Sequence, residues 1–408
     1  MKTLFAFTVL ILAATPALAQ QPQDPPKPQV PRTLNEFNPT ITVFHDMLWR
    51  LDNKDVIEIE DGEVIDKDDK FLLRETEVDF RASLDPYADG VFIIALEQEV
   101  PNEYEVDVEE GYVRIKSLPF GFWEEPPLGT KLKIGRFLPA IGRQNRLHTH
   151  DLPQPQRGLA YEQFVGDHPY IANGASAEMI LPANLTLTAE ALQGGGWDFA
   201  SEGENRPAYV ANLSWFNTFA DEHDVEIGLI GYYGHNDVER RRHVHFYGLD
   251  FLYKWKPVRQ GEWRSVVVAG QLFYGSREFV VDLDGDGDNL REPGVDIDGD
   301  GVIDDRVEDR HRAWGWFAYA QYQIDRRWYV GLRYDWTEYL EDFLPTSDDD
   351  ASRVTPYVSL YLSEFFRIRV AYEYTNSDIH EDDDLHTLLF ELTAVFGSHP
   401  AHPYWVNQ

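Results

Sequence analysis

The chain contains no cysteine, which excludes disulfide frameworks, zinc–thiolate sites, iron–sulfur clusters and cysteine nucleophiles. Basic residues are also scarce: 36 Lys and Arg stand against 71 Asp and Glu, so the formal net charge is −35. A nucleic-acid-binding protein needs a cationic face, and this balance therefore argues against such a partner. A solvated acidic surface is the simplest interpretation, and attraction of cations is the alternative.

Long apolar runs are missing as well, except at the N-terminus. There Lys2 precedes an apolar stretch over 4–14, and Ala17-Leu18-Ala19 forms an A-x-A cleavage site. We therefore predict a signal peptide over 1–19, followed by a Pro- and Gln-rich periplasmic linker over 20–38. No later run approaches the roughly 20 apolar residues of a spanning helix. Two interpretations stay open, a soluble periplasmic protein and a membrane protein that spans without helices.

From residue 39 onward, apolar and polar residues alternate with a period of two, which is typical of β-strands. In residues 328–336, for example, Trp328, Leu332 and Tyr334 share one face of a predicted strand, and Arg333 and Asp335 share the other. We count about sixteen such segments, with fourteen or eighteen as alternatives. They lie near 39–51, 71–84, 91–101, 106–117, 131–138, 170–181, 184–194, 208–218, 224–235, 245–256, 264–278, 312–325, 327–339, 353–364, 367–378 and 385–396.

Short connections between these segments alternate with long polar ones, which indicates an up-and-down antiparallel meander. In a lipid bilayer a closed barrel pairs every backbone group without leaving an edge, and its outer face needs apolar residues with Trp and Tyr at the headgroup levels. The 11 Trp and 21 Tyr fit that arrangement. We predict an all-β transmembrane antiparallel β-barrel over 39–396 in the bacterial outer membrane, in contact with its lipid, with a periplasmic tail over 397–408. A soluble β-sandwich is the alternative.

Several motifs resemble known barrel families. "GYVRI" (111–115) followed by "KIGRFLPAIG" (133–142) is similar to the phosphate-selective O/P type of porin. "RLHTHDLP" (146–153) and "VFGSHPAHPY" (395–404) resemble outer-membrane proteins described as zinc-regulated or TonB-linked receptors. The resemblance implies an outer-membrane barrel without deciding its cargo. We expect no plug domain, because too few residues separate the cleavage site from the first strand.

In sixteen-stranded porins the loop that corresponds to residues 139–169 folds inward and narrows the channel, so the resemblance implies that role here. The charges on it and on the neighbouring strands are candidate pore-lining groups, because charged walls select ions in a water-filled pore. We expect a cationic wall opposite an acidic one, or else charges that merely pair within the lumen. The cationic candidates are Arg114, Lys116, Lys131, Lys133, Arg143, Arg146 and Arg157, and the acidic candidates are Glu75, Glu77 and Asp79.

The segment "HTHD" is a candidate transition-metal site. His148 and His150 point the same way on an extended chain, and Asp151 adds an oxygen ligand. Imidazole suits zinc, copper or nickel, but a closed site needs four ligands. Zn²⁺ is therefore one interpretation, and hydrogen bonding within an external loop is the other.

An acidic external loop over 279–311 carries the sharpest local motif. "DIDGDGVID" (296–304) places carboxylates at the first, third, fifth and ninth positions of a calcium loop, and a glycine at the sixth. It is similar to the repeats of dockerin and thrombospondin type 3 modules, although Val307 replaces the usual twelfth-position Glu. We predict Ca²⁺ binding here, with a solvated loop as the alternative. The ligands would be Asp296, Asp298, Asp300, Val302 through its carbonyl, and Asp304, with Asp282, Asp284 and Asp286 in a less complete copy.

No P-loop, G-x-S-x-G or H-E-x-x-H motif occurs, and we expect no enzymatic activity. Two functions stay open. One is a porin-like channel for passive diffusion of small hydrophilic or ionic solutes. Many sixteen-stranded porins are trimers, so the resemblance implies a homotrimer for this channel. The other is a receptor barrel that captures zinc or calcium at external loops.

Overall fold

The computed structural model describes residues 39–54, 57–60, 63–66, 70–98, 104–166, 168–193, 207–235, 243–261, 263–280, 308–338, 350–377 and 384–397. The predicted signal peptide and linker lie outside these residues, as do the tail beyond Gly397 and all eight predicted calcium ligands. Calcium binding therefore stays a prediction.

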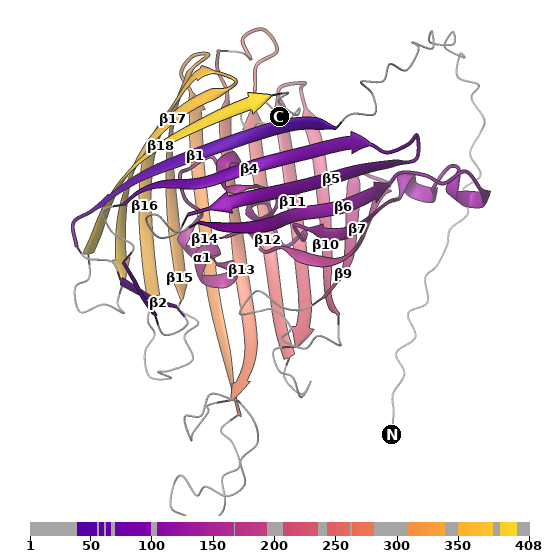
Figure 1. The fold of residues 1–408 in the computed structure, drawn as a ribbon, viewed down its shortest axis with the longest axis horizontal. Helices are drawn as coiled ribbons and strands as arrows, with labels where there is room; N and C mark the ends of the chain where they lie inside the picture. The colour runs from indigo at the N-terminus through magenta and orange to yellow at the C-terminus, as the bar shows by residue number, and fades with distance from the viewer. Residues whose placement is uncertain are drawn as a thin grey trace, which may run out of the picture.

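Sixteen antiparallel strands form one closed barrel, which confirms the predicted fold class and strand number (Figure 1). Neighbours along the chain pair with one another, and β1 closes the ring against β18, with Thr42 opposite Gly397 and Asp52 opposite Thr387. The strands are β1 (Thr40–Asp52), β4 (Phe71–Ser83), β5 (Ala88–Glu97), β6 (Glu105–Ile115), β7 (Lys131–Phe137), β8 (Ala172–Leu181), β9 (Leu185–Leu192), β10 (Ala208–Phe219), β11 (His223–His235), β12 (His243–Trp255), β13 (Val266–Val280), β14 (Glu308–Gln323), β15 (Trp328–Glu338), β16 (Asp350–Ser363), β17 (Phe366–Ser377) and β18 (Asp384–Gly397).

The alternation in the sequence separates two faces of the barrel wall. Trp316 and Leu332 point outward with 36% and 52% of their surface exposed, whereas Arg333 and Asp335 of the same wall point inward and are fully buried. Phe396, near the end of β18, also lies on the outer face. An apolar outer face around a polar interior is the arrangement that a lipid-embedded barrel requires.

The connections follow the predicted asymmetry, with short turns at one end of the barrel. β8 and β9 are joined by residues 182–184, and β14 and β15 by 324–327. Several features were not predicted, among them the hairpin of β2 (Ile57–Glu60) with β3 (Glu63–Asp66) and the short 3₁₀ helices η2 (Gly121–Trp123) and η3 (Pro127–Gly129) between β6 and β7.

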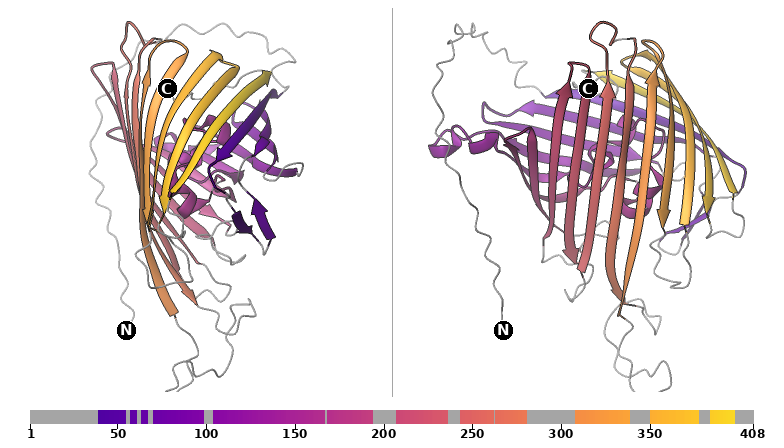
Figure 2. Two further views of the ribbon diagram at one scale, coloured as in Figure 1. Left: turned by 90° about the vertical axis from the view of Figure 1, so that its left-hand side faces the viewer. Right: turned by 180° about the vertical axis from the view of Figure 1, so that it is seen from behind.

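The connection between β7 and β8 runs inside the ring of strands, as the resemblance to porins implied. We refer to its residues 139–169 as the inner loop. It contains the 3₁₀ helices η4 (Gln144–Arg146) and η5 (Thr149–Asp151) and the helix α1 (Leu159–Val165), which packs against β13 to β16 (Figures 1 and 2). In the described part of the chain, no helix is long and apolar enough to cross a membrane.

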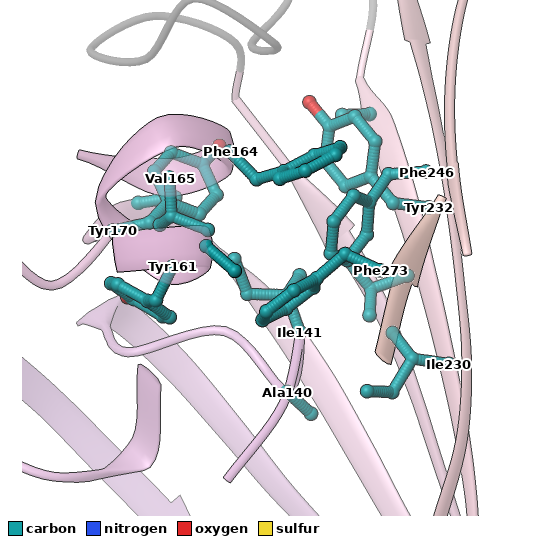
Figure 3. Packing of buried hydrophobic residues seen from close by; sticks show 14 of the residues in the cluster. Ala140, Ile141, Tyr161, Phe164, Val165, Tyr170, Ile230, Tyr232, Phe246 and Phe273 are labelled. Carbon is teal, nitrogen blue, oxygen red and sulfur yellow. The ribbon is translucent and has the colours of Figure 1, made fainter. Parts of the chain in front are cut away.

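An apolar cluster fixes the inner loop to the wall. Phe164 of α1 lies between wall aromatics, with ring centres 5.5 Å from Phe273 and 6.0 Å from Phe246 (Figure 3). Ile141 and Tyr161 of the inner loop are fully buried in the same cluster. Burial of aromatic area is a large stabilising contribution, so the inner loop is a packed part of the barrel core.

Candidate functional site: the lumen around the inner loop

Asn145 holds the two ends of the inner loop together. Its amide nitrogen donates hydrogen bonds to the carbonyls of Pro139 and Tyr170, at 2.8 and 3.1 Å. Its side-chain oxygen accepts from the Tyr161 hydroxyl at 2.5 Å and from the Tyr170 amide at 2.7 Å. Because Asn145 is fully buried and all these bonds are made, the loop has a defined base from which it enters the lumen.

Four arginines of the wall donate hydrogen bonds to backbone carbonyls of the inner loop. Arg333 donates to Gln156 at 2.7 Å, and Arg74 to Pro155 at 2.5 Å. Arg367 and Arg369 donate to His150 and Leu152 in the same way. These guanidinium groups are neutralised by wall carboxylates, such as Asp335 at 2.8 Å from Arg333. The inner loop is thus bound tightly along β15, β17 and β4.

On the opposite side, a cavity of about 440 Å³ lies between the inner loop and strands β6 to β10. Its polar lining includes groups of both charge signs: Arg81, Arg114, Lys131, Lys133 and Arg146, with Glu110, Asp151, Glu178 and Glu190. Ser176, Thr186, Thr188 and Ser214 add hydroxyl groups. The inner loop therefore divides the lumen into two unequal parts, and the larger polar free space lies on this side.

The acidic groups of this cavity are already engaged. Glu190 accepts a hydrogen bond from the Ala140 amide at 2.8 Å, and Glu178 forms an ion pair with Lys131 at 3.3 Å. Glu110 accepts from the Leu138 amide at 3.4 Å. Only Glu178 has its charge paired by these contacts, and the lining as a whole holds five Lys and Arg side chains against four Asp and Glu side chains.

Three of the cations have no carboxylate partner within ion-pair distance among the described residues. Arg114 donates to the Tyr112 hydroxyl at 3.4 Å, and Lys133 lies 4.8 Å from the centre of the Tyr112 ring. Arg146, on the inner loop, completes this set. Arg114, Lys133 and Arg146 are referred to below as the cationic triad.

The other predicted cations have different surroundings. Lys116 forms an ion pair with Asp89 at 2.7 Å, and Arg143 reaches across to Glu226 at 3.1 Å. Arg157 is only 2% exposed and donates to the Gln144 and Leu147 carbonyls at 2.7 and 2.9 Å, so it supports the inner loop from within. It also borders a smaller cavity of about 150 Å³ near β1 and β4.

The predicted acidic residues of β4 do not form an open wall facing the cations. Asp79 forms an ion pair with Arg81 of its own strand at 2.8 Å. Glu75 and Glu77 are buried beneath the inner loop, where they contact His148 and His150. The physical reason is that histidines of the inner loop cover these carboxylates, so the acidic wall expected from the sequence is not open to the lumen here.

The two histidines differ from the expected metal site in place and in partners. They lie inside the barrel, 5% and 3% exposed, and not on an external surface. Their Nδ1 atoms face carboxylates of the wall: His148 lies 3.3 Å from Glu77 and 3.1 Å from Glu109, and His150 lies 3.3 Å from Glu77. Asp151 is at 3.6 Å, from the other nitrogen of His150.

This environment favours positive charge on the inner loop. Burial lowers the pKa of His150, but the nearby carboxylates of Glu77, Asp151 and Glu75 outweigh that effect and raise it to about 9. The same balance, with Glu77 and Glu109 as the nearby carboxylates, raises the pKa of His148 well above its usual value. A proton or another cation is therefore stabilised between the histidines and the wall.

Sequence reasoning missed Glu109 as a lumen residue. Glu109 and Glu110 are consecutive, yet both are buried inside the barrel, because the pairing of β5 with β6 shifts by one residue at this point. A β-bulge of this kind re-aims a side chain and breaks the period of two. In contrast, Arg333 and Arg369 occupy inward-facing positions of the alternating pattern, and this pattern could have identified them as lumen residues.

Comparison with known proteins is informative about the fold. No family model matches the chain. An uncharacterized protein of Aquifex aeolicus (strain VF5) is 24% identical over 364 residues, which cover 82% of this chain and 70% of that protein.

Solved structures of outer-membrane channels are similar in shape over most of their length. A complex of Salmonella typhi OmpF with daunomycin has a TM-score of 0.55 at 11% identity, covering 89% of this chain and 99% of that one. The chain has the fold of a sixteen-stranded outer-membrane porin. An anion-selective porin from Comamonas acidovorans has a TM-score of 0.53 at 10% identity, covering 88% of this chain and 99% of that one. The outer-membrane channel DcaP of Acinetobacter baumannii also gives 0.53, at 11% identity, with 88% and 96% covered.

Proposed function

We propose that this porin-like barrel is a passive channel of the outer membrane for small hydrophilic solutes, and that it prefers anions. The observation that carries the proposal is the cavity beside the inner loop, where the cationic triad has no ion-pair partner among the described residues. Charged groups at a narrow, water-filled passage select permeating ions by sign. The motifs that resemble phosphate-selective porins agree with this preference.

The local charge of the cavity is opposite to that of the whole chain, which carries a net charge of −35. Charges separated by more than about 8 Å of salt solution are largely screened from one another, so the groups that line the passage decide which ion enters it. Capture of metal at external histidines receives no support from the buried positions of His148 and His150. A homotrimer and the absence of enzymatic activity remain part of the proposal.

Planar bilayers test the channel and its selectivity together. We expect the purified protein to give discrete conductance steps, and the reversal potential in a salt gradient to show that chloride is more permeable than potassium. The double substitution Arg114→Gln with Lys133→Gln should bring the permeability ratio close to one, because it removes two of the three cations of the triad. Arg327→Gln, at an exposed turn, is the matched control and should leave the ratio unchanged.

The outcomes separate the two parts of the proposal. Absence of conductance steps from a correctly folded barrel would contradict the channel. Steps with a cation preference in the unaltered protein would retain the channel and contradict the role of the triad.

A further inference from the structure

Two histidines and three carboxylates converge at the contact between the inner loop and the wall. Ligand atoms of Glu77, Glu109 and His148 lie within 4.8 Å of one another, and the same holds for Glu75, Glu77 and His150. Glu77 belongs to both sets, and all five residues are buried. We refer to these five residues as the His–Glu cluster. Its groups come from β4, β6 and the inner loop, far apart in the sequence.

The distances in the cluster match the spacing of ligands around a metal ion. The Nδ1 atoms of His148 and His150 both lie 3.3 Å from the same oxygen, Oε2 of Glu77. The remaining contacts are 3.1 Å to Glu109 and 3.5 Å to Glu75. Ligands at about 2.0–2.1 Å from a tetrahedral zinc ion are separated by about 3.3 Å. The 3.1 Å contact between His148 and Glu109 is also a hydrogen bond, whereas the three longer contacts exceed the roughly 2.7–2.9 Å of a charge-assisted hydrogen bond.

The surrounding structure orients each ligand toward this point. The bulge at Glu109 turns its side chain into the lumen, although the strand period alone would place it on the outer face. The His150 ring stacks on Phe44, with ring centres 4.0 Å apart, and its backbone carbonyl accepts a hydrogen bond from Arg367. Ligands held by packing and by hydrogen bonds to neighbouring groups are a general feature of metal sites.

The charge of the cluster favours bound cations, either protons on the histidines or a metal ion. Three carboxylates and two neutral imidazoles would place three negative charges together at a buried position, which is strongly unfavourable in a medium of low dielectric constant. Imidazole nitrogen with carboxylate oxygen is a ligand combination that suits zinc and similar divalent transition metals.

We propose that the His–Glu cluster binds at least one divalent transition-metal ion of the zinc type, with Glu77 as the ligand shared by the two histidines. The ion joins the inner loop to β4 and β6 and so fixes the position of His148, which borders the cavity of the proposed channel. The proposed site adds a second property to that of a passive channel. The metal ion is a structural part of the constriction and not a transported solute.

Metal content of the full-length protein tests the site. After purification and dialysis against zinc-containing and then zinc-free buffer, mass spectrometry of the metal is expected to give at least one zinc per chain. Glu77→Gln is expected to reduce this content to background. Glu178→Gln, a lumen carboxylate outside the cluster, is the matched control and should retain the metal.

Cobalt(II) provides a second measurement on the unaltered chain, which does not depend on how a variant folds. Uptake should produce the intense visible absorption of a four-coordinate site, and zinc should displace it. Heat-modifiable mobility on SDS gels verifies that each variant is a folded barrel. No retained zinc and no cobalt absorption in the folded, unaltered protein would overturn the proposal, and so would loss of the metal in Glu178→Gln. None of these measurements depends on conductance, so they remain decisive if the channel proposal fails.

Discussion

Replacing Gly315 with leucine is expected to lower the single-channel conductance severalfold, because the new side chain pushes helix α1 away from β14 and into the lumen. A Cβ atom at Gly315 would lie 2.7 Å from Cε2 of Phe164, 2.9 Å from Oγ1 of Thr337 and 3.1 Å from Cβ of Ala160. Overpacking of this kind forces neighbouring groups to move. Since Phe164 and Ala160 belong to α1, the inner loop is the part that must move, and it moves toward the cavity on its other side, so the passage should become narrower.

The measurement is the amplitude of conductance steps in planar bilayers, compared with a matched glycine on the same barrel. Gly231 of β11 has open space where its Cβ would lie, so Gly231→Leu should leave the conductance unchanged. Adding Phe164→Ala to Gly315→Leu should bring the conductance back toward that of the unaltered protein, because the smaller side chain makes room for leucine. A folded Gly315→Leu barrel with unaltered conductance would show that the inner loop is not the constriction.

The strand pattern was predictable because it depends on one local rule. Alternate residues of a strand face the lipid and the lumen. The lipid side requires apolar groups, so this alternation is visible in the sequence, as in Leu332 next to Arg333. Strand pairing between neighbours then follows from short turns. The ends of β14 illustrate the limit: the pattern predicted a start at residue 312, and the pairing with β13 extends it to Glu308.

The contacts of the candidate site were not predictable for two physical reasons. The bulge at Glu109 interrupts the alternation of inward and outward residues, and no turn residue or glycine at that position indicates it in the sequence. The partners of the inner loop depend on closure of the barrel, which brings Glu77, Glu109 and His148 together over large sequence separations. The sequence showed two histidines with the same orientation, but only the closed barrel supplies the carboxylates that face them.

Substituting Arg333 with methionine should produce the largest loss of stability among the changes considered. Arg333 is fully buried and forms an ion pair with Asp335 at 2.8 Å, and Asp335 is fully buried as well. No other cation of the described residues lies within ion-pair distance of Asp335. Removing one partner of a buried ion pair typically costs about 3–5 kcal/mol, because the remaining charge is left in a medium of low dielectric constant.

Equilibrium unfolding in guanidinium, with the barrel in detergent or lipid, measures this loss. Arg327→Met at an exposed turn is the control and should change the free energy of unfolding by less than about 0.5 kcal/mol. A similarly small change in Arg333→Met would contradict the prediction, since it would mean that water reaches Asp335 or that the carboxylate is protonated at no great cost.

The double variant Arg333→Met with Asp335→Asn separates the two roles of this arginine. It eliminates the unpaired charge of Asp335, so much of the lost stability should return. Glu373, which lies 3.3 Å from Arg333, keeps an ion pair with Arg353 at 3.9 Å in both variants. The hydrogen bond from Arg333 to the Gln156 carbonyl, 2.7 Å long, is absent from both the single and the double variant. Whatever stability the double variant fails to recover therefore includes the contribution of that contact, about 1 kcal/mol for a typical hydrogen bond. A double variant no more stable than the single one would mean that Arg333 acts chiefly through the inner loop and Glu373, and not by neutralising Asp335.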